Sequence, residues 1–214
     1  MDLLDYRGNN YSQNGEDGII EKILSILKIE NGFFVEFGAA DGKMCSNTWN
    51  LVERGWSGLY IEGLESYYNE CSDNIKPYSN VKCINKYVDY KGDNTLDNIL
   101  KESNVIYNFD ILSIDIDSYD YHVWKSLEKF KPKIVIIEIN SSIPEGHYQI
   151  HNPPEEILTS FSSMVDLGVS KGYKPLCHTG NLIFIDSEIE FEEVNFYQLK
   201  NWIGLFNNPY KQTN

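Results

Sequence analysis

Apolar and polar positions alternate along the chain with two different periods. Residues 16–27 carry apolar side chains every three or four positions, as one face of a helix does, whereas residues 134–139 are apolar at almost every position, as in a strand covered on both faces. Applied to the chain, these patterns predict strands at 33–37, 58–62, 81–85, 109–116 and 134–139. They predict helices at 16–27, 48–54, 67–74, 96–102, 121–130 and 154–171.

The carboxyl-terminal part is expected to close the sheet. An antiparallel pair is predicted from 176–177 and 182–185, with a turn at 179–181, and a short amphipathic helix is predicted around 199–205. Strands that alternate with helices favour an α/β fold with a doubly wound, mainly parallel sheet. In such sheets ligands bind beyond the carboxyl ends of the strands, so the functional residues are expected at strand ends.

Composition and charge narrow the class of protein. The chain has 214 residues, of which 42% are hydrophobic, and no repeat or linker divides it, so a single domain over 1–214 is expected. Its formal net charge of −14 disfavours nucleic-acid and anionic-membrane partners, because such a surface repels phosphates. None of the 4 cysteines forms a CxxC pair, and the chain shows no signal-peptide pattern and no apolar run of membrane-spanning length. A cytoplasmic protein with reduced thiols is expected.

The first predicted strand runs directly into a loop of small and acidic residues, 38–42. Gly38 and Gly42 allow the backbone to approach a ligand closely, but they do not form the G-x-G-x-x-G pattern of a dinucleotide site. Glu36 and Asp41 would repel a pyrophosphate, and they suit the sulfonium and ammonium groups of S-adenosylmethionine. The alternative is an ordinary glycine turn whose acidic residues face water.

A third carboxylate, Glu62, ends the second predicted strand about twenty residues after the loop. In this position a carboxylate can accept hydrogen bonds from both hydroxyls of a ribose. Dinucleotide sites use the same device, so Glu62 alone does not distinguish S-adenosylmethionine from NAD. An ordinary strand-end carboxylate is the structural alternative.

Taken together, the motifs resemble those of class I S-adenosylmethionine-dependent methyltransferases, and within them the FkbM-like group. The matching segments are YSQNGED at 11–17, VEFGAADG at 35–42, LSIDID at 112–117 with VWKSL at 123–127, and IEIN at 137–140 with Ile143 and Pro144. The resemblance spans 11–185. It implies a seven-stranded Rossmann-like methyltransferase sheet with an antiparallel final strand, and an enzyme that methylates hydroxyls on sugars or natural products.

One segment departs from the FkbM-like pattern, which has Asp-x-Glu-Gly after the fourth strand. Here Asp115 and Asp117 stand in an Asp-x-Asp-x-Tyr arrangement, which resembles metal-dependent sugar O-methyltransferases. These two residues are two positions apart, so their side chains are expected to point the same way. The same holds for Glu138 and Asn140 on the next strand. Asp117, Glu138 and Asn140 therefore become candidate ligands for Mg²⁺ or another divalent cation. Without a metal, Asp115 or Asp117 is the candidate general base, and the alternative is that Asp115 and Glu138 only order loops.

Other polar residues are candidates with weaker support. His122 and His147 lie near the expected methyl-transfer point and can take a proton near neutral pH, although packing roles are commoner for such histidines. The resemblance implies that Gln13 closes over the donor, and Asn47 either caps a helix or touches the donor. The predicted cofactor-binding residues are Gln13, Glu36, Gly38, Ala39, Asp41, Asn47, Glu62 and Asp115.

The sequence therefore predicts an S-adenosyl-L-methionine-dependent O-methyltransferase. Its expected acceptor is a hydroxyl of a small polar molecule, such as a sugar, a nucleotide sugar or a polysaccharide precursor, and a homodimer remains open. An NAD-dependent oxidoreductase on a similar sheet and a catalytically inactive binding domain are the alternatives.

Overall fold

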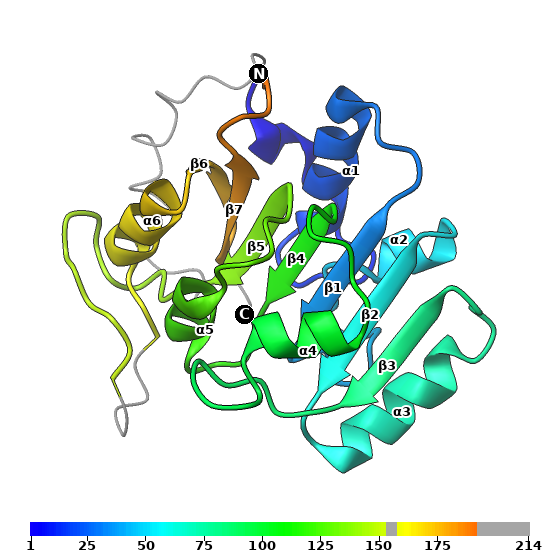
Figure 1. The fold of residues 1–214 in the computed structure, drawn as a ribbon. Coiled ribbons are helices and arrows are strands. Elements are labelled where there is room, and N and C mark those ends of the chain that lie inside the picture. Colours follow the sequence, from blue (N-terminus) through cyan, green and yellow to red (C-terminus); the bar gives the residue numbers. More distant parts are fainter. Residues whose placement is uncertain (153–157, 192–214) are drawn as a thin grey trace, which may run out of the picture.

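Alternating strands and helices build the protein in the order that the apolar pattern predicts (Figure 1). The computed structural model describes residues 1–152 and 158–191. The elements are the 3-10 helix η1 (Leu3–Tyr6), α1 (Glu16–Leu27), β1 (Phe33–Phe37), α2 (Trp49–Glu53), β2 (Ser57–Glu62), α3 (Glu65–Ile75), β3 (Val81–Asn85), α4 (Leu96–Glu102), β4 (Ile111–Ile114), α5 (Asp120–Ser126), β5 (Ile134–Glu138), α6 (Phe161–Ser170), β6 (Tyr173–His178) and β7 (Asn181–Asp186).

Within the described residues, the strands form one 7-stranded sheet in the order β3-β2-β1-β4-β5-β7-β6. β7 runs antiparallel to both β5 and β6, and the remaining pairs are parallel. The fold class and the reversed final strand are thus confirmed. The strand order changes direction between β1 and β4, where Phe37 lies beside Ile114. This switch point leaves room for a ligand beyond the carboxyl ends of β1 and β4.

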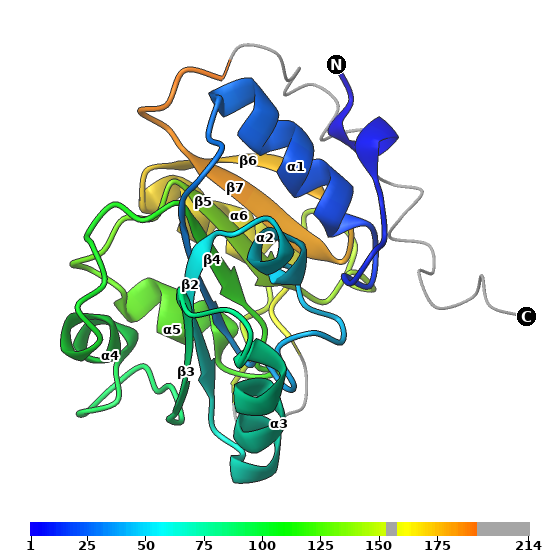
Figure 2. The same ribbon diagram turned by 90° about the vertical axis from the view of Figure 1, so that its right-hand side faces the viewer.

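Helices cover both faces of the sheet, which explains why its strands are apolar at successive positions. α1, α2 and α3 pack on one face, and α4, α5 and α6 pack on the other (Figure 2). Along β1, Phe34 belongs to the core under the first group and Val35 to the core under the second. Alternate residues of a strand point to opposite faces, so a strand between two helical layers buries both sets.

One helix and one strand end earlier than predicted. α5 ends at Ser126 and not near residue 130, because the Asp97 carboxylate accepts the amides of Glu128 and Lys129 and draws the chain out of the helix. β4 ends at Ile114 and not at residue 116, because the Asp120 carboxylate accepts the Ile116 and Ser118 amides and holds the chain in a turn.

The helix predicted over 154–171 begins later, at Phe161. Ser160 is its N-cap, and the Ser160 hydroxyl accepts a hydrogen bond from the Ser163 amide. Residues 153–157 and the helix predicted around 199–205 lie outside the described part of the chain. The antiparallel pair predicted at 176–177 and 182–185 is confirmed and is longer than expected.

The N-terminal segment is tied to the turn between β6 and β7. Glu16, which is fully buried, accepts hydrogen bonds from the Thr179 hydroxyl at 2.5 Å and from the Asn181 side chain at 3.2 Å. Asp17 accepts hydrogen bonds from the backbone amides of residues 10–12.

Among the described residues, no helix is both long and apolar enough to cross a bilayer.

Candidate active site at the carboxyl edge of the sheet

A cavity of about 600 Å³ opens beyond the carboxyl ends of β1 to β4. Its wall combines the loop after β1, the end of β2, the start of α3, and the loops after β3 and β4. The lining residues are Gly38, Ala40, Ile61, Glu62, Gly63, Leu64, Tyr67, Lys86, Tyr87, Val88, Asp89, Asp115, Ile116, Asp117, Ser118 and Tyr119. The cavity therefore lies where the strand order predicts a ligand site.

The loop after β1 packs tightly between β2 and β4. The Gly38 amide donates a hydrogen bond to the Ile61 carbonyl at 3.2 Å, and Gly38 has a φ of 72°. A Cβ atom at Gly38 would lie only 1.6 Å from the Asp115 carbonyl oxygen. Glycine is thus required here both for the left-handed backbone and for the close approach of the two loops. Ala39, the next residue, is buried.

Glu62 lines the cavity and holds its wall together. One of its carboxylate oxygens accepts the Ala40 amide at 2.8 Å, and the other accepts the Leu64 amide at 2.7 Å. The same side chain thus connects the loop after β1 to the start of α3. A carboxylate can accept roughly four hydrogen bonds, so these two leave Glu62 able to accept more from a ligand.

Glu36 is buried and has a different role from Glu62. It accepts hydrogen bonds from Ser46 Oγ at 2.8 Å, Thr48 Oγ1 at 2.5 Å and the Asn47 amide at 3.1 Å. Burial raises the pKa of Glu36, and these hydrogen bonds act in the opposite direction. Glu36 is not among the residues that line the cavity, so it contributes to the site by ordering 46–48.

Four more of the predicted cofactor-binding residues lie outside the cavity lining, the buried Ala39 among them. Asn47 is buried and donates to Ser113 Oγ on β4 at 3.0 Å, and the interpretation that it caps α2 is wrong, because Thr48 is the N-cap. Asp41 accepts the amides of residues 43 and 44 and closes the loop. Gln13 is exposed in the N-terminal segment.

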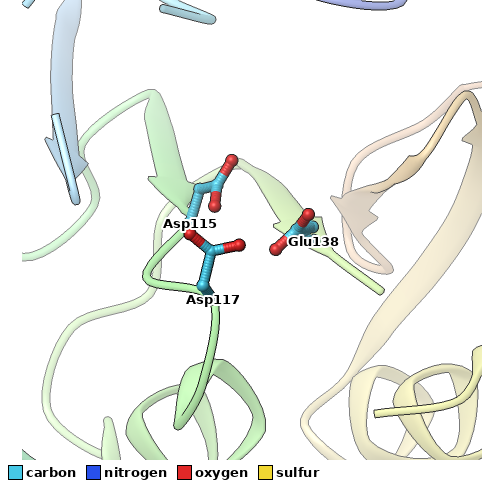
Figure 3. A group of neighbouring side chains, drawn as sticks. All are labelled: Asp115, Asp117 and Glu138. Atoms are coloured by element: carbon cyan, nitrogen blue, oxygen red, sulfur yellow. The ribbon is translucent and has the colours of Figure 1, made fainter. Parts of the chain in front are cut away.

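The carboxylates of Asp115, Asp117 and Glu138 converge beside the cavity (Figure 3). One oxygen atom from each lies within 4.8 Å of the others, and we call this set the acid cluster. The convergence was predicted, but its cause was not, because Asp115 and Asp117 follow β4 and are not part of it. Asp117 has a φ of 55°, so the two side chains meet through a turn and not through strand alternation.

The turn after β4 depends on Asp120, which the sequence analysis did not single out. The buried Asp120 carboxylate accepts the Ile116 amide at 2.9 Å and the Ser118 amide at 3.0 Å. An aspartate at the start of a predicted helix, after an irregular segment, is the signal that points to such a residue. Asp120 thereby holds Asp115 and Asp117 at the edge of the cavity.

Burial and neighbouring negative charge favour a proton shared between the carboxyls of Asp115 and Glu138. Burial and the neighbouring charges of Asp120 and Asp117 raise the pKa of Asp115 to about 7. Burial and the charges of Asp115 and Asp117 raise the pKa of Glu138 to about 9. Like charges this close cannot all be ionised without a cost, so the protonated form of Glu138 is favoured.

The remaining candidates have other contacts. Asn140 Oδ1 accepts from the Ser142 amide at 2.9 Å and from its hydroxyl at 2.5 Å, which commits it to its own loop. His122 Nε2 is 2.9 Å from the His151 carbonyl oxygen, so His122 supports a loop. His147 is exposed in the segment after β5. The acid cluster is therefore the set of described residues that could hold a divalent cation. Its carboxylate oxygens are hard ligands that fit Mg²⁺. Glu138 would first have to lose its proton to bind the metal.

Comparisons with known proteins relate this fold to methyltransferases. No family model and no curated protein sequence matches the chain. The CMeT domain of the citrinin polyketide synthase has a TM-score of 0.53 and 12% identity, covering 83% of this chain and 54% of that chain. The CurJ carbon methyltransferase has a TM-score of 0.52 and 10% identity, covering 79% and 52%. The chain thus spans about half the length of these two proteins.

A third structure covers nearly the whole of both chains. The N-terminal domain of EvdMO1, solved with SAH and D-fucose, has a TM-score of 0.50 and 13% identity, covering 86% of this chain and 91% of that chain. At such identities the likeness shows the fold alone. The fold is that of class I S-adenosylmethionine-dependent methyltransferases.

Substituting Gly38 by alanine should destabilise the protein more than substituting Gly92. Both have positive φ, 72° and 74°, so both variants bear the cost of a left-handed alanine, about 1–2 kcal/mol. Around Gly92 no described heavy atom lies within 4 Å of the added Cβ, whereas at Gly38 it meets the Asp115 carbonyl. In urea unfolding, Gly38→Ala should lose about 2 kcal/mol more than Gly92→Ala. Equal losses would contradict the close packing of the two loops.

Replacing Glu138 by glutamine should change how stability depends on pH. A carboxyl whose pKa is raised in the folded state binds more protons there than in the unfolded chain. Its contribution to the stability of the fold is therefore present at low pH and is lost as the pH rises. Between about pH 5 and pH 9, the free energy of unfolding of the parent should fall relative to that of Glu138→Gln by up to about 5 kcal/mol. Urea unfolding in EDTA measures this, with the exposed Asp93→Asn as control. A difference that does not vary with pH would refute the shared proton.

Proposed function

We propose that the protein is an S-adenosylmethionine-dependent O-methyltransferase that acts on a hydroxyl of a small polar acceptor. The observation that carries this proposal is Glu62, which lines a cavity of about 600 Å³ beside the Gly38 loop, in the fold of S-adenosylmethionine-dependent methyltransferases. This carboxylate is set to accept hydrogen bonds from both hydroxyls of the donor's ribose. Gly38 and Ala40 allow the donor to approach the backbone closely.

The position of the acid cluster supports a direction for the donor. Asp115 and Asp117 belong both to the cavity lining and to the acid cluster, so the cavity ends at these carboxylates. With the ribose at Glu62, the positively charged sulfonium group is proposed to lie toward Asp115, where the negative potential favours it. The acceptor would then enter from the side of the acid cluster.

Methyl transfer needs a base for the acceptor's proton. The acceptor oxygen attacks the methyl carbon, the carbon–sulfur bond breaks, and neutral S-adenosylhomocysteine leaves, while the hydroxyl proton passes to a carboxylate. Asp115 suits this task, because its pKa of about 7 lies near the operating pH, where general-base catalysis is most effective. Asp117 is the alternative base, and His122 and His147 are less suited because of their contacts and position.

The charge of the acid cluster also limits the acceptor. Its carboxylates repel phosphate groups at close range, so an acceptor such as a sugar or a polysaccharide precursor would present an uncharged hydroxyl to them. The phosphates of a nucleotide sugar would have to lie away from the cluster. A divalent cation, if bound by Asp115, Asp117 and Glu138, would polarise the acceptor hydroxyl.

Removing the Glu62 side chain should weaken donor binding. Glu62→Ala loses the proposed acceptor for the ribose hydroxyls, so the affinity for S-adenosylhomocysteine in calorimetry should fall about tenfold or more. The matched control is Glu65→Ala, an exposed glutamate in the first turn of α3, which should bind as the parent does. Asp41→Ala should have a smaller effect, because Asp41 shapes the loop from outside the cavity.

The same titration separates the proposal from an NAD-dependent oxidoreductase. The parent should bind S-adenosylhomocysteine and not NAD, because the loop after β1 lacks the third glycine of a dinucleotide site and the carboxylates of Glu62, Asp115 and Asp117 at the cavity repel a pyrophosphate. Tight binding of NAD alone would refute the methyltransferase. A parent that binds neither ligand would favour the domain without catalytic activity.

We expect Mg²⁺ to bind weakly. With Glu138 protonated and Asn140 committed to Ser142, Asp115 and Asp117 remain as the charged ligands. Adding about 1 mM Mg²⁺ should leave the thermal unfolding midpoint unchanged, whereas occupancy at 100 times the Kd would stabilise the fold by about 2.7 kcal/mol. A Mg²⁺-dependent rise that Asp117→Asn abolishes would establish a metal site and overturn this expectation.

A further inference from the structure

The segment before α1 lies next to the acid cluster. Glu138 continues the alternation of Ile134 and Ile136, which belong to the core under α1, so its side chain points to the sheet face that α1 covers. Asn181 on β7 is the partner of Glu138 in the sheet, and its side chain donates a hydrogen bond to Glu16 at 3.2 Å. Glu16 is the first residue of α1, so it brings the N-terminal segment to the end of β5.

The buried carboxylate of Glu16 also fixes the position of Asn14. One of its oxygens accepts the Asn14 backbone amide at 2.9 Å, and the other accepts the Thr179 hydroxyl at 2.5 Å. The Asn14 side chain packs on the turn between β6 and β7, because a Cβ atom at Gly180 would lie 2.8 Å from Asn14 Nδ2. The Gly180 carbonyl in turn accepts the amide of Ile139, one residue beyond β5, at 3.4 Å. Asn14 is therefore held at the end of β5, beside the acid cluster.

The side-chain amide of Asn14 is available to a ligand. The residue is exposed, and only its backbone is hydrogen-bonded to the described part of the chain. Close to it, Asn181 Oδ1 and Glu138 Oε2 are buried and have no hydrogen-bond donor within residues 1–152 and 158–191. The Asn181 side chain is 7% exposed, so solvent does not satisfy it. This end of the site thus lacks hydrogen-bond donors, which a ligand with hydroxyl groups can supply.

We infer that Asn14 binds a second hydroxyl of the acceptor, and that the enzyme therefore selects molecules with hydroxyls on two adjacent carbon atoms. This inference rests on the proposed function, because the first hydroxyl is the one that gives its proton to the acid cluster and receives the methyl group. The second hydroxyl lies between the acid cluster and the turn at Gly180, within reach of the Asn14 amide.

A hydroxyl fits the Asn14 amide better than other polar groups do. The amide both donates and accepts hydrogen bonds, and a hydroxyl matches both. An ionised phosphate or carboxylate only accepts, and the acid cluster repels its charge. An ammonium group only donates, so it leaves the amide donors of Asn14 without a partner. β5 and β7 are neighbours in the sheet, about 4.8 Å apart, and two adjacent hydroxyls with hydrogen bonds of about 2.8 Å can span this gap.

The experiment uses the full chain saturated with S-adenosylhomocysteine and two matched probes. One probe is the cis-cyclohexanediol with its hydroxyls on adjacent carbons, and the other is cyclohexanol, which lacks the second hydroxyl. In protein labelled for NMR, the side-chain amide signal of Asn14, assigned from its loss in Asn14→Ala, should shift with the diol and not with cyclohexanol. The diol should bind about tenfold more tightly than cyclohexanol, because the second hydroxyl adds hydrogen bonds to Asn14.

Asn14→Ala should bind the diol about tenfold more weakly than the parent does, but S-adenosylhomocysteine equally well, because Asn14 does not line the cavity. The matched control is Asn108→Ala, at an exposed asparagine near the amino end of β4, which should bind both ligands as the parent does.

The inference is overturned if the diol does not bind, or if cyclohexanol binds as tightly. It is also overturned if Asn14→Ala keeps the affinity of the parent for the diol, or if it loses affinity for S-adenosylhomocysteine. A parent that does not bind S-adenosylhomocysteine would refute the proposed function, while titration of the unliganded protein with the diol would still decide whether Asn14 binds the second hydroxyl.

Discussion

The close approach of Gly38 to the Asp115 carbonyl oxygen is the contact on which the rest of the site depends. It joins the loop after β1 to the loop after β4, at the point where the strand order changes direction. Because these two loops touch, Asp115 and Asp117 line the cavity and also belong to the acid cluster. Only a residue without a Cβ atom permits this contact, and any larger side chain would separate the two halves of the site.

The acidic residues of the site fall into two groups that differ in their partners. Glu36 and Asp120 are buried, accept several hydrogen bonds from nearby amides and hydroxyls, and order the segments that follow β1 and β4. Glu62, Asp115 and Glu138 stand at strand ends, and Glu62 and Asp115 line the cavity. Some acidic residues near the site are therefore fully hydrogen-bonded within the protein and order its loops. A smaller set remains available to bind a ligand or a proton.

The predicted elements succeeded where local periodicity decides the structure. α1, β1, β3 and α4 have the predicted bounds, because their apolar residues match the two-sided core of the sheet. Glu62 and Gly38, which the sequence singles out by a strand end and a glycine loop, both line the cavity. The role of Glu36 was not predicted, because its partners Ser46 and Thr48 reach it only after the chain has turned.

The sequence by itself determined the sheet, its helical layers and the edge at which the cavity opens, because apolar periodicity and glycine positions are local properties of the chain. Tertiary structure alone decided which carboxylates face the cavity, which share a proton, and where α5 stops. Those outcomes depend on groups far apart in sequence: Asp115 meets Glu138, and Asp97 meets Glu128. Burial and like-charge repulsion arise only when the fold brings such groups together, so no local pattern encodes them.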